Sequence, residues 1–136
     1  MAQKRILVVE DDEKLADLIR RVLEGINHAV TTVGSGAAAI HEASIWRPDL
    51  VILDLHLPDT SGYDVCRLLR ALYHPSTMPV LMFTGLNQPI DQLRGFAHGA
   101  DAYLTKPCEL SELVGTVGTL LEHVAHGGAG DSALID

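Results

Sequence analysis

Hydrophobic residues along the chain follow two alternating patterns. Short uninterrupted apolar runs are separated by longer segments in which apolar residues recur at helical spacing. The runs are Ile6–Val9, Leu50–Leu53 and Val80–Phe83, with weaker ones at Ala29–Val33 and Ala102–Leu104. Continuous apolarity over about four to eight residues is typical of parallel strands that are buried on both faces. The pattern therefore predicts a buried parallel sheet of five strands.

The segments between these runs predict helices. Apolar residues follow the i, i+3, i+4, i+7 spacing in Leu15–Leu23, Val65–Leu72 and Glu109–His126, and more weakly in Ala37–Trp46 and Ile90–His98. Glycine adopts the left-handed conformation that ends many helices without steric cost. Gly25 and Gly99 therefore mark the expected ends of two helices.

The strand–helix unit occurs five times in succession. Such alternation predicts an α/β fold with right-handed crossovers and helices on both faces of a parallel sheet. We expect one domain at residues 4–126, followed by a flexible tail or truncated linker at 127–136, where glycine is frequent and periodicity is absent. Ligands of such folds bind at the carboxyl ends of the strands, so functional residues are expected just after each apolar run.

Composition narrows the possible functions. The 136 residues are 47% hydrophobic, and 18 acidic against 10 basic residues give a net charge of −8. This balance argues against direct binding of nucleic acid or anionic membranes, which requires clustered basic residues. The first residues, MAQKRILVV, lack a secretory signal pattern, and no apolar run could span a membrane, so we expect a cytoplasmic protein. The two cysteines are far apart in sequence, which disfavours a disulfide framework or a thiolate zinc site.

Acidic residues follow two of the predicted strands. Glu10, Asp11 and Asp12 come after the first strand, and Asp54 comes after the third. If these strands are neighbours, Glu10, Asp11 and Asp54 converge. Two carboxylates about 4 Å apart repel by about 4 kcal/mol at an effective dielectric constant of about 20, so such clusters usually hold a cation or share a proton. Oxygen ligands on a rigid scaffold favour Mg²⁺.

The alternative is that each acid only caps the helix that follows it. Asp12 fits that interpretation, because a helix is predicted to begin near Glu13. Asp54 does not, because the next helix is expected only near Gly62. The cluster as a whole therefore favours a cation site.

A hydroxyl and an ammonium group follow the last two strands. Thr84 follows the fourth strand. Lys106 follows the fifth and precedes Pro107, which biases Lys106 towards an extended conformation and permits a cis peptide bond. Each residue alone has an ordinary explanation, as a strand threonine or a solvated lysine. Their occurrence at the same sheet edge as the acids makes both candidate functional residues.

Four motifs together resemble the receiver domain of two-component response regulators, similar to chemotaxis regulators. They are ILVVEDD, PDLVILDLHLPDTSGYDV, PVLMFTG and GADAYLTKP, and the resemblance extends from about Lys4 to His126. It implies a flavodoxin-like fold with strand order 2-1-3-4-5.

The resemblance also implies roles at the acidic end of the site. Asp54 matches the phosphoacceptor. Glu10 and Asp11 match the acidic pair that holds Mg²⁺ together with Asp54. The backbone carbonyl of His56 matches a further metal ligand.

Three other positions match residues that respond to the phosphoryl group. Thr84 matches the hydroxyl that binds a phosphoryl oxygen and moves on activation. Lys106 matches the lysine that pairs with the phosphoryl group. Tyr103 matches the aromatic residue that swings inward with the threonine, although an aromatic that simply packs at the sheet edge remains an alternative.

The function implied is a signalling switch, with no enzymatic activity except promotion of its own phosphorylation and dephosphorylation. A sensor histidine kinase or histidine phosphotransfer protein would donate the phosphoryl group. Phosphorylation would change the surface of the fourth helix, fifth strand and fifth helix, which a downstream protein effector or a missing output domain would read. Partners are thus proteins, and neither nucleic acid nor membrane is expected to bind this domain directly.

Two sequence features do not fit the family resemblance simply, and two alternative functions remain open. The last predicted helix has no Lys or Arg, so the interhelical salt-bridge interface of the OmpR subfamily cannot form there. The segment GSGAAA at 34–39 resembles a weak dinucleotide-binding motif, which a helix start explains better. The alternatives are a constitutive interaction module with a vestigial phosphorylation site, and a small flavodoxin-like enzyme or nucleotide binder.

Overall fold

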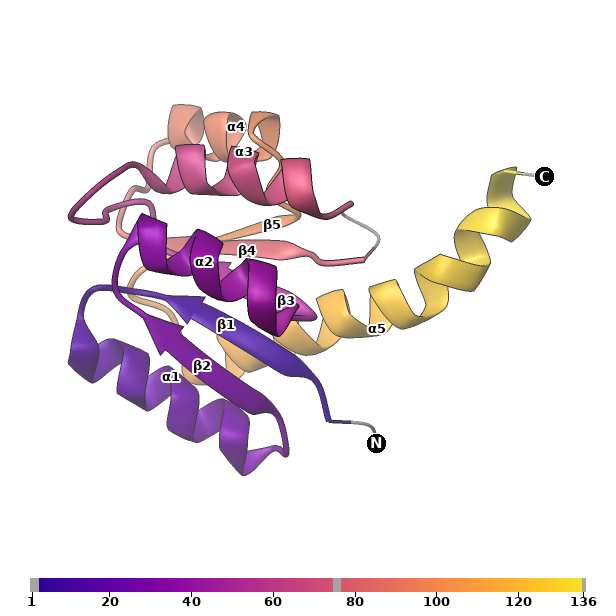
Figure 1. Cartoon of the computed structure of the whole chain (residues 1–136), viewed down its shortest axis with the longest axis horizontal. Coiled ribbons are helices and arrows are strands. Elements are labelled where there is room, and N and C mark those ends of the chain that lie inside the picture. The colour runs from indigo at the N-terminus through magenta and orange to yellow at the C-terminus, as the bar shows by residue number, and fades with distance from the viewer. Residues whose placement is uncertain (1–2, 75–76, 136) are drawn as a thin grey trace.

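The chain forms a five-stranded parallel sheet between two layers of helices (Figure 1). The computed structural model describes residues 3–74 and 77–135, with 125–135 as backbone only. The elements are β1 (Arg5–Val9), α1 (Glu13–Gly25), β2 (Ala29–Val33), α2 (Gly36–Trp46), β3 (Leu50–Leu53), α3 (Gly62–Leu72), β4 (Val80–Thr84), α4 (Pro89–Ala97), β5 (Ala102–Thr105) and α5 (Leu110–Ile135). The predicted alternation and the flavodoxin-like class are confirmed.

The strand order is β2-β1-β3-β4-β5, as the resemblance implied. β1 and β3 are hydrogen-bonded neighbours, with Val9 opposite Leu53. On the other side of β3, Leu53 lies opposite Met82 of β4. The carboxyl ends of β1 and β3 therefore meet at one edge of the sheet, where the chain order changes direction.

Successive residues of each central strand enter different cores, because side chains alternate across a sheet. Ile6 and Val8 of β1 pack with α1 and α5, whereas Leu7 and Val9 pack with α2 and α3. α4 lies on the same side as α3, where Gly95 is close to Met82. Burial on both faces explains why these strands read as uninterrupted apolar runs.

The helix ends follow the local sequence signals. The Asp12 carboxylate caps α1 by accepting hydrogen bonds from the backbone N–H groups of Lys14 and Leu15. Ser35 caps α2, so the GSGAAA segment is a helix start. Gly99 follows α4 with a φ of 107°, a conformation that glycine adopts without strain.

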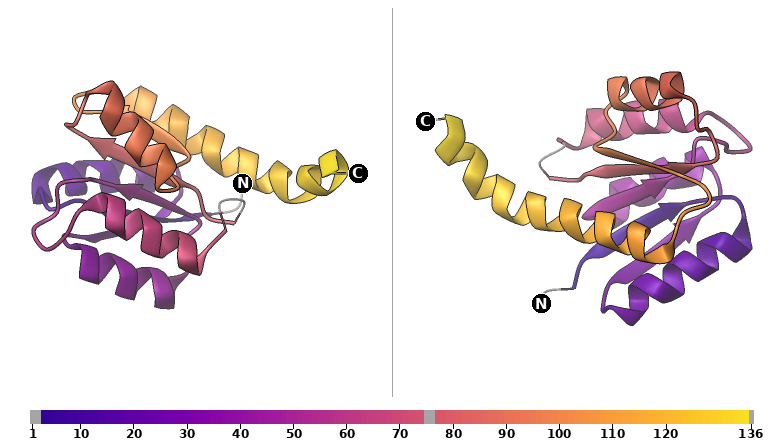
Figure 2. Two further views of the ribbon diagram at one scale, coloured as in Figure 1. Left: turned by 90° about the horizontal axis from the view of Figure 1, so that it is seen from above. Right: turned by 180° about the vertical axis from the view of Figure 1, so that it is seen from behind.

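α5 differs from its expected length. Its backbone continues as a helix to Ile135, beyond the predicted end at His126, and projects past the sheet (Figure 2). No proline follows Pro107, so no residue type that breaks a helix sterically interrupts this segment. The division into a domain at 4–126 and a tail or linker at 127–136 stays a prediction. Among the described residues, no helix is long and apolar enough to cross a membrane.

Candidate functional site

The carboxylates of Glu10, Asp11 and Asp54, here called the acidic cluster, meet at the carboxyl ends of β1 and β3. One oxygen atom from each carboxylate lies within 4.8 Å of the other two. Glu10 and Asp54 are each only 5% exposed, whereas Asp11 is exposed. The convergence expected from the sequence is thus present, because the two strands are neighbours.

Lys106 brings a positive charge to the acidic cluster from the end of β5. Its ammonium group donates hydrogen bonds to Glu10 Oε1 at 2.5 Å and to Asp54 Oδ2 at 2.9 Å. The peptide bond between Lys106 and Pro107 is cis. Lys106 thereby forms one ion-pair network with Glu10, which lies 96 positions earlier in the sequence, and with Asp54, which lies 52 positions earlier.

Burial sets the electrostatics of this network. Burial raises the pKa of Glu10 above its usual value, although the hydrogen bond from Lys106 partly opposes it. Burial by itself lowers the pKa of Lys106, but the hydrogen bonds to Glu10 and Asp54 outweigh it and leave that pKa raised. One ammonium group balances only one of the three carboxylates. The hard oxygen donors and the remaining negative charge therefore fit a divalent cation such as Mg²⁺.

The loop between β3 and α3 carries two of the predicted site residues. The backbone N–H of His56 donates to Asp54 Oδ1 at 3.2 Å, and His56 pairs with Ser61 in an isolated antiparallel bridge. Ser61 caps α3, and Gly62 N donates to the Leu55 carbonyl at 3.0 Å. Asp54 is therefore not the cap of the next helix, in agreement with the sequence interpretation.

Gly62 allows α3 to begin directly against the phosphoacceptor candidate. A Cβ atom there would press on the Asp54 carbonyl oxygen and lie 2.6 Å from Leu55 Cα, and backbone atoms cannot swing aside. We expect Gly62→Ala to destabilise the protein by at least about 2 kcal/mol, measured by urea unfolding. Gly85→Ala is the matched control, because no atom lies within 4 Å of its Cβ position. Equal stability of the two variants would contradict this close packing.

Thr84 and Tyr103 are linked to each other through Leu86, and within the described residues neither forms a hydrogen bond with the acidic cluster. The fully buried Thr84 hydroxyl accepts a long hydrogen bond, 3.4 Å, from Leu86 N. The Tyr103 hydroxyl donates to the Leu86 carbonyl at 2.8 Å, and its ring lies 6.5 Å from that of Phe96 on α4. Burial raises the pKa of Tyr103 to about 12. Tyr103 is thus bonded to the β4–α4 loop, which is more than edge-strand packing.

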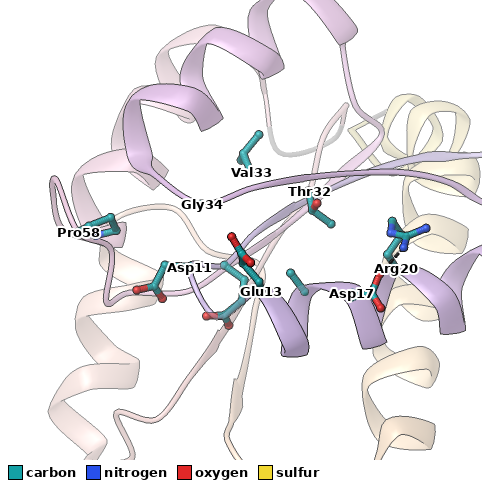
Figure 3. Close-up of a pocket in the computed structure, with 10 residues that line it drawn as sticks. Asp11, Glu13, Asp17, Arg20, Thr32, Val33, Gly34 and Pro58 are labelled. Atoms are coloured by element: carbon teal, nitrogen blue, oxygen red, sulfur yellow. Dashed lines mark hydrogen bonds and ion pairs between the residues drawn. The ribbon is translucent and has the colours of Figure 1, made fainter.

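A groove of about 650 Å³ opens beside the acidic cluster, between α1 and the β2–α2 loop (Figure 3). Asp11, Gly34 and Pro58 line it together with Asp17 and Arg20 of α1. The ion pair between Asp17 and Arg20 lies within the groove. The site is therefore open to solvent and to other molecules on the Asp11 side.

Sequence reasoning missed the role of Asp59 in this region. Its carboxylate accepts hydrogen bonds from Gly36 N at 2.8 Å and Ala37 N at 2.9 Å. These partners lie 23 and 22 positions earlier in the chain, so no local pattern reveals the contact. The only sequence signal is an acidic residue in a loop that also carries a metal-ligand candidate.

The fold and the site together define a class: a doubly wound α/β domain with an acidic cluster and a lysine at the strand ends. The family profile of the response regulator receiver domain matches residues 6–118. The chain belongs to this family of two-component signal transduction, as the sequence motifs indicated.

Relatives and solved structures agree with this assignment. The chain is 43% identical over 115 residues to the DNA-binding response regulator MtrA of Mycobacterium tuberculosis (strain H37Rv), covering 85% of this chain and 49% of MtrA. It thus spans about half the length of the curated relatives it matches.

Two receiver structures illustrate the similarity in fold. A CheY-like receiver domain protein from Methanospirillum hungatei JF-1 has a TM-score of 0.87 at 25% identity, with 93% of this chain and 99% of that one covered. The BeF3-activated N-terminal receiver domain of Klebsiella pneumoniae RstA has a TM-score of 0.81 at 28% identity, with coverage of 86% and 97%.

Proposed function

We propose that this receiver domain is a switch that accepts one phosphoryl group on Asp54 in the presence of Mg²⁺. The observation that carries the proposal is the direct contact of Lys106 with both buried carboxylates, Glu10 and Asp54. A lysine held at 2.9 Å from the proposed acceptor carboxylate is in place to neutralise a phosphoryl oxygen as it arrives.

The proposed reaction is a nucleophilic displacement at phosphorus. An oxygen of the Asp54 carboxylate forms a bond to phosphorus while the bond from phosphorus to the donor's imidazole nitrogen breaks, and the donor leaves with that electron pair. Phosphoryl transfer requires positioning and charge neutralisation more than covalent assistance. His56 N fixes the orientation of the carboxylate through its bond to Asp54 Oδ1.

Glu10, Asp11, Asp54 and the backbone carbonyl of His56 would hold the metal ion. When bound, Mg²⁺ supplies charge neutralisation for the phosphoryl oxygens that Lys106 does not reach. Lys106 keeps its proton because the pKa of its ammonium group is raised between Glu10 and Asp54. Thr84, buried at the end of β4, would donate its hydroxyl to a phosphoryl oxygen after releasing Leu86 N.

The new charge would be read at α4, β5 and α5. A phosphoaspartate adds roughly one to two negative charges beside Lys106, by analogy with other phosphorylated side chains. Movement of Thr84 would pull on Leu86, which holds the Tyr103 hydroxyl. Tyr103 lies against α4, whose large apolar residues Ile90, Leu93 and Phe96 are exposed. This exposed apolar surface supports a protein partner there.

The partners proposed are a cytoplasmic histidine kinase or phosphotransfer protein as donor and a protein domain as reader. Relatives such as MtrA are named as DNA-binding response regulators. An output domain joined to this chain or a separate effector would therefore act as the reader. A constitutive module with a vestigial site is disfavoured, because the acidic cluster is complete and Lys106 pairs with two of its carboxylates.

The test is intact-mass analysis after incubation with acetyl phosphate and Mg²⁺. We expect a gain of one phosphoryl group, which disappears in the Asp54→Asn variant and when Mg²⁺ is removed with EDTA. Because rapid hydrolysis would hide a modified form, binding of beryllium fluoride is measured in parallel. Absence of both phosphorylation and beryllium fluoride binding would overturn the proposal in favour of the vestigial module.

A further inference from the structure

Asp59 forms a link between two loops that the proposed function leaves without explanation. It lies in the β3–α3 loop, three residues after His56, and is itself exposed. Both oxygens of its carboxylate are used: Oδ1 accepts from Gly36 N and Oδ2 accepts from Ala37 N. These hydrogen bonds lower the pKa of Asp59, so the carboxylate is ionised at neutral pH.

This contact is not needed to cap α2. Ser35 already occupies the N-cap position and accepts a hydrogen bond from Ala38 N at 3.1 Å. Asp59 instead binds the two preceding N–H groups of the first turn from a distant part of the chain. A carboxylate in this position also interacts favourably with the positive end of the helix dipole.

The segment that leads into α2 packs against Glu10 and Asp11 of the acidic cluster. Glu10 N donates to the Val33 carbonyl at 2.9 Å, just before the β2–α2 loop. A Cβ atom on Gly34 would lie 3.8 Å from Asp11 Cα, so the loop packs against Asp11. Figure 3 shows Asp11, Gly34 and Pro58, the neighbour of Asp59, around the same groove.

The packing of the β3–α3 loop on α2 is close. A Cβ atom on Gly36 would collide with the Thr60 side chain and lie 2.9 Å from Val65 Cγ2. The loop is therefore held at Asp54 by the His56 N–H, at α3 by the Ser61 bridge and at α2 by Asp59. Of these anchors, Asp59 is the one that joins the loop to α2, whose preceding segment packs against Glu10 and Asp11.

We propose that Asp59 is a positioning residue for the metal site. By joining the β3–α3 loop to the first turn of α2, it would limit the movement of the loop that carries the His56 carbonyl. Mg²⁺ demands near-ideal octahedral geometry, so a loose loop weakens binding. Groups that orient metal ligands typically change metal affinity by about 10- to 100-fold when removed. This inference rests on the proposed metal site.

The experiment compares Mg²⁺ affinity by isothermal titration of the full chain in wild type, Asp59→Ala and Asp59→Asn. We expect the Kd of Asp59→Ala to rise about tenfold, with a smaller rise for Asp59→Asn, which retains one acceptor oxygen. The chemical shift of the His56 amide on Mg²⁺ addition is followed by NMR as a readout of loop position. In Asp59→Ala, the His56 amide signal should be broader than in wild type, or its chemical shift should change less when Mg²⁺ is added.

Two controls separate positioning from helix stability and from charge. Ser35→Ala removes an acceptor from the same helix start without touching the β3–α3 loop. Glu13→Gln removes one negative charge from the lining of the same groove. At about 0.15 M salt, which weakens the effect of an exposed charge, both should keep the Kd within about twofold of wild type.

The outcomes are distinguishable. If wild type and Asp59→Ala bind Mg²⁺ with equal affinity, the positioning role of Asp59 is overturned, but the proposed metal site is not. An equal loss of affinity in Ser35→Ala assigns the effect to helix stability and also overturns it. Wild type that binds no Mg²⁺ removes the metal site itself, and the proposed function with it.

Discussion

Replacing Lys106 with methionine is expected to slow phosphorylation of Asp54 by acetyl phosphate by at least about a hundredfold at saturating Mg²⁺. The Lys106 ammonium lies 2.9 Å from Asp54 Oδ2 and, in the proposed function, would meet the incoming phosphoryl oxygen as a charged donor. Methionine fills a similar volume but carries no charge. The rate is measured from the time course of the phosphorylated mass.

The same substitution leaves Glu10 and Asp54 buried without their cation. Removing one partner of a buried ion pair typically costs about 3–5 kcal/mol, so the metal-free variant should be markedly less stable. Mg²⁺ should restore more stability to the variant than to wild type, because no ammonium competes for the carboxylates. Lys106→Arg is the matched control, since it keeps the charge but not the geometry. A Lys106→Met rate within threefold of wild type would contradict the assigned role.

Replacing Asp54 with asparagine is expected to stabilise the metal-free protein. The acidic cluster and Lys106 together carry three negative charges and one positive charge at neutral pH, and two of the carboxylates are buried. Asparagine removes one of the repelling charges and keeps one of the two oxygens, which can still accept from Lys106, while the acceptor for His56 N is lost. Two carboxylates about 4 Å apart repel each other by about 4 kcal/mol. Relief of this repulsion should outweigh the weaker hydrogen bond between residue 54 and Lys106, because Lys106 still pairs with Glu10.

We expect a rise in melting temperature of about 3–6 °C for Asp54→Asn in EDTA, measured by circular dichroism. In excess Mg²⁺ the order should reverse, because the wild-type carboxylate gains a ligand interaction that the amide largely lacks. Asp64→Asn, which changes an exposed carboxylate on α3, serves as the control and should shift the melting temperature little. A lower melting temperature for Asp54→Asn in EDTA would show that mutual repulsion does not dominate the cluster.

The elements that sequence patterns predicted best are the ones buried on both faces. The central residues of β1, β3 and β4 alternate between two cores, so consecutive positions are apolar and the run is visible in the sequence. The helical backbone of α5 extends beyond the helix end expected from the sequence. Glycine at 127, 128 and 130 suggested a tail, whereas helical backbone continues to Ile135. Glycine lowers helix propensity by about 1 kcal/mol per residue but, unlike proline, does not prevent a helix.

Some residues of the site could be predicted from the sequence, whereas others could be recognised only from the structure. Glu10, Asp54 and Lys106 could be selected from the sequence, because each follows an apolar run and parallel strands end at one edge. Asp59 could not, because its importance depends on where α2 begins relative to a loop 22 positions later. The link from Tyr103 to Leu86 was likewise invisible, since it depends on the path of the β4–α4 loop.

The sequence by itself thus determined the fold class, the family and the chemical types at the strand ends. These properties follow from periodicity and from residue order, which act over short stretches of chain. The tertiary structure alone decided which carboxylates share Lys106, how deeply Glu10 is buried and which helix receives Asp59. Such properties depend on distances between segments far apart in sequence, because burial and charge pairing act through space.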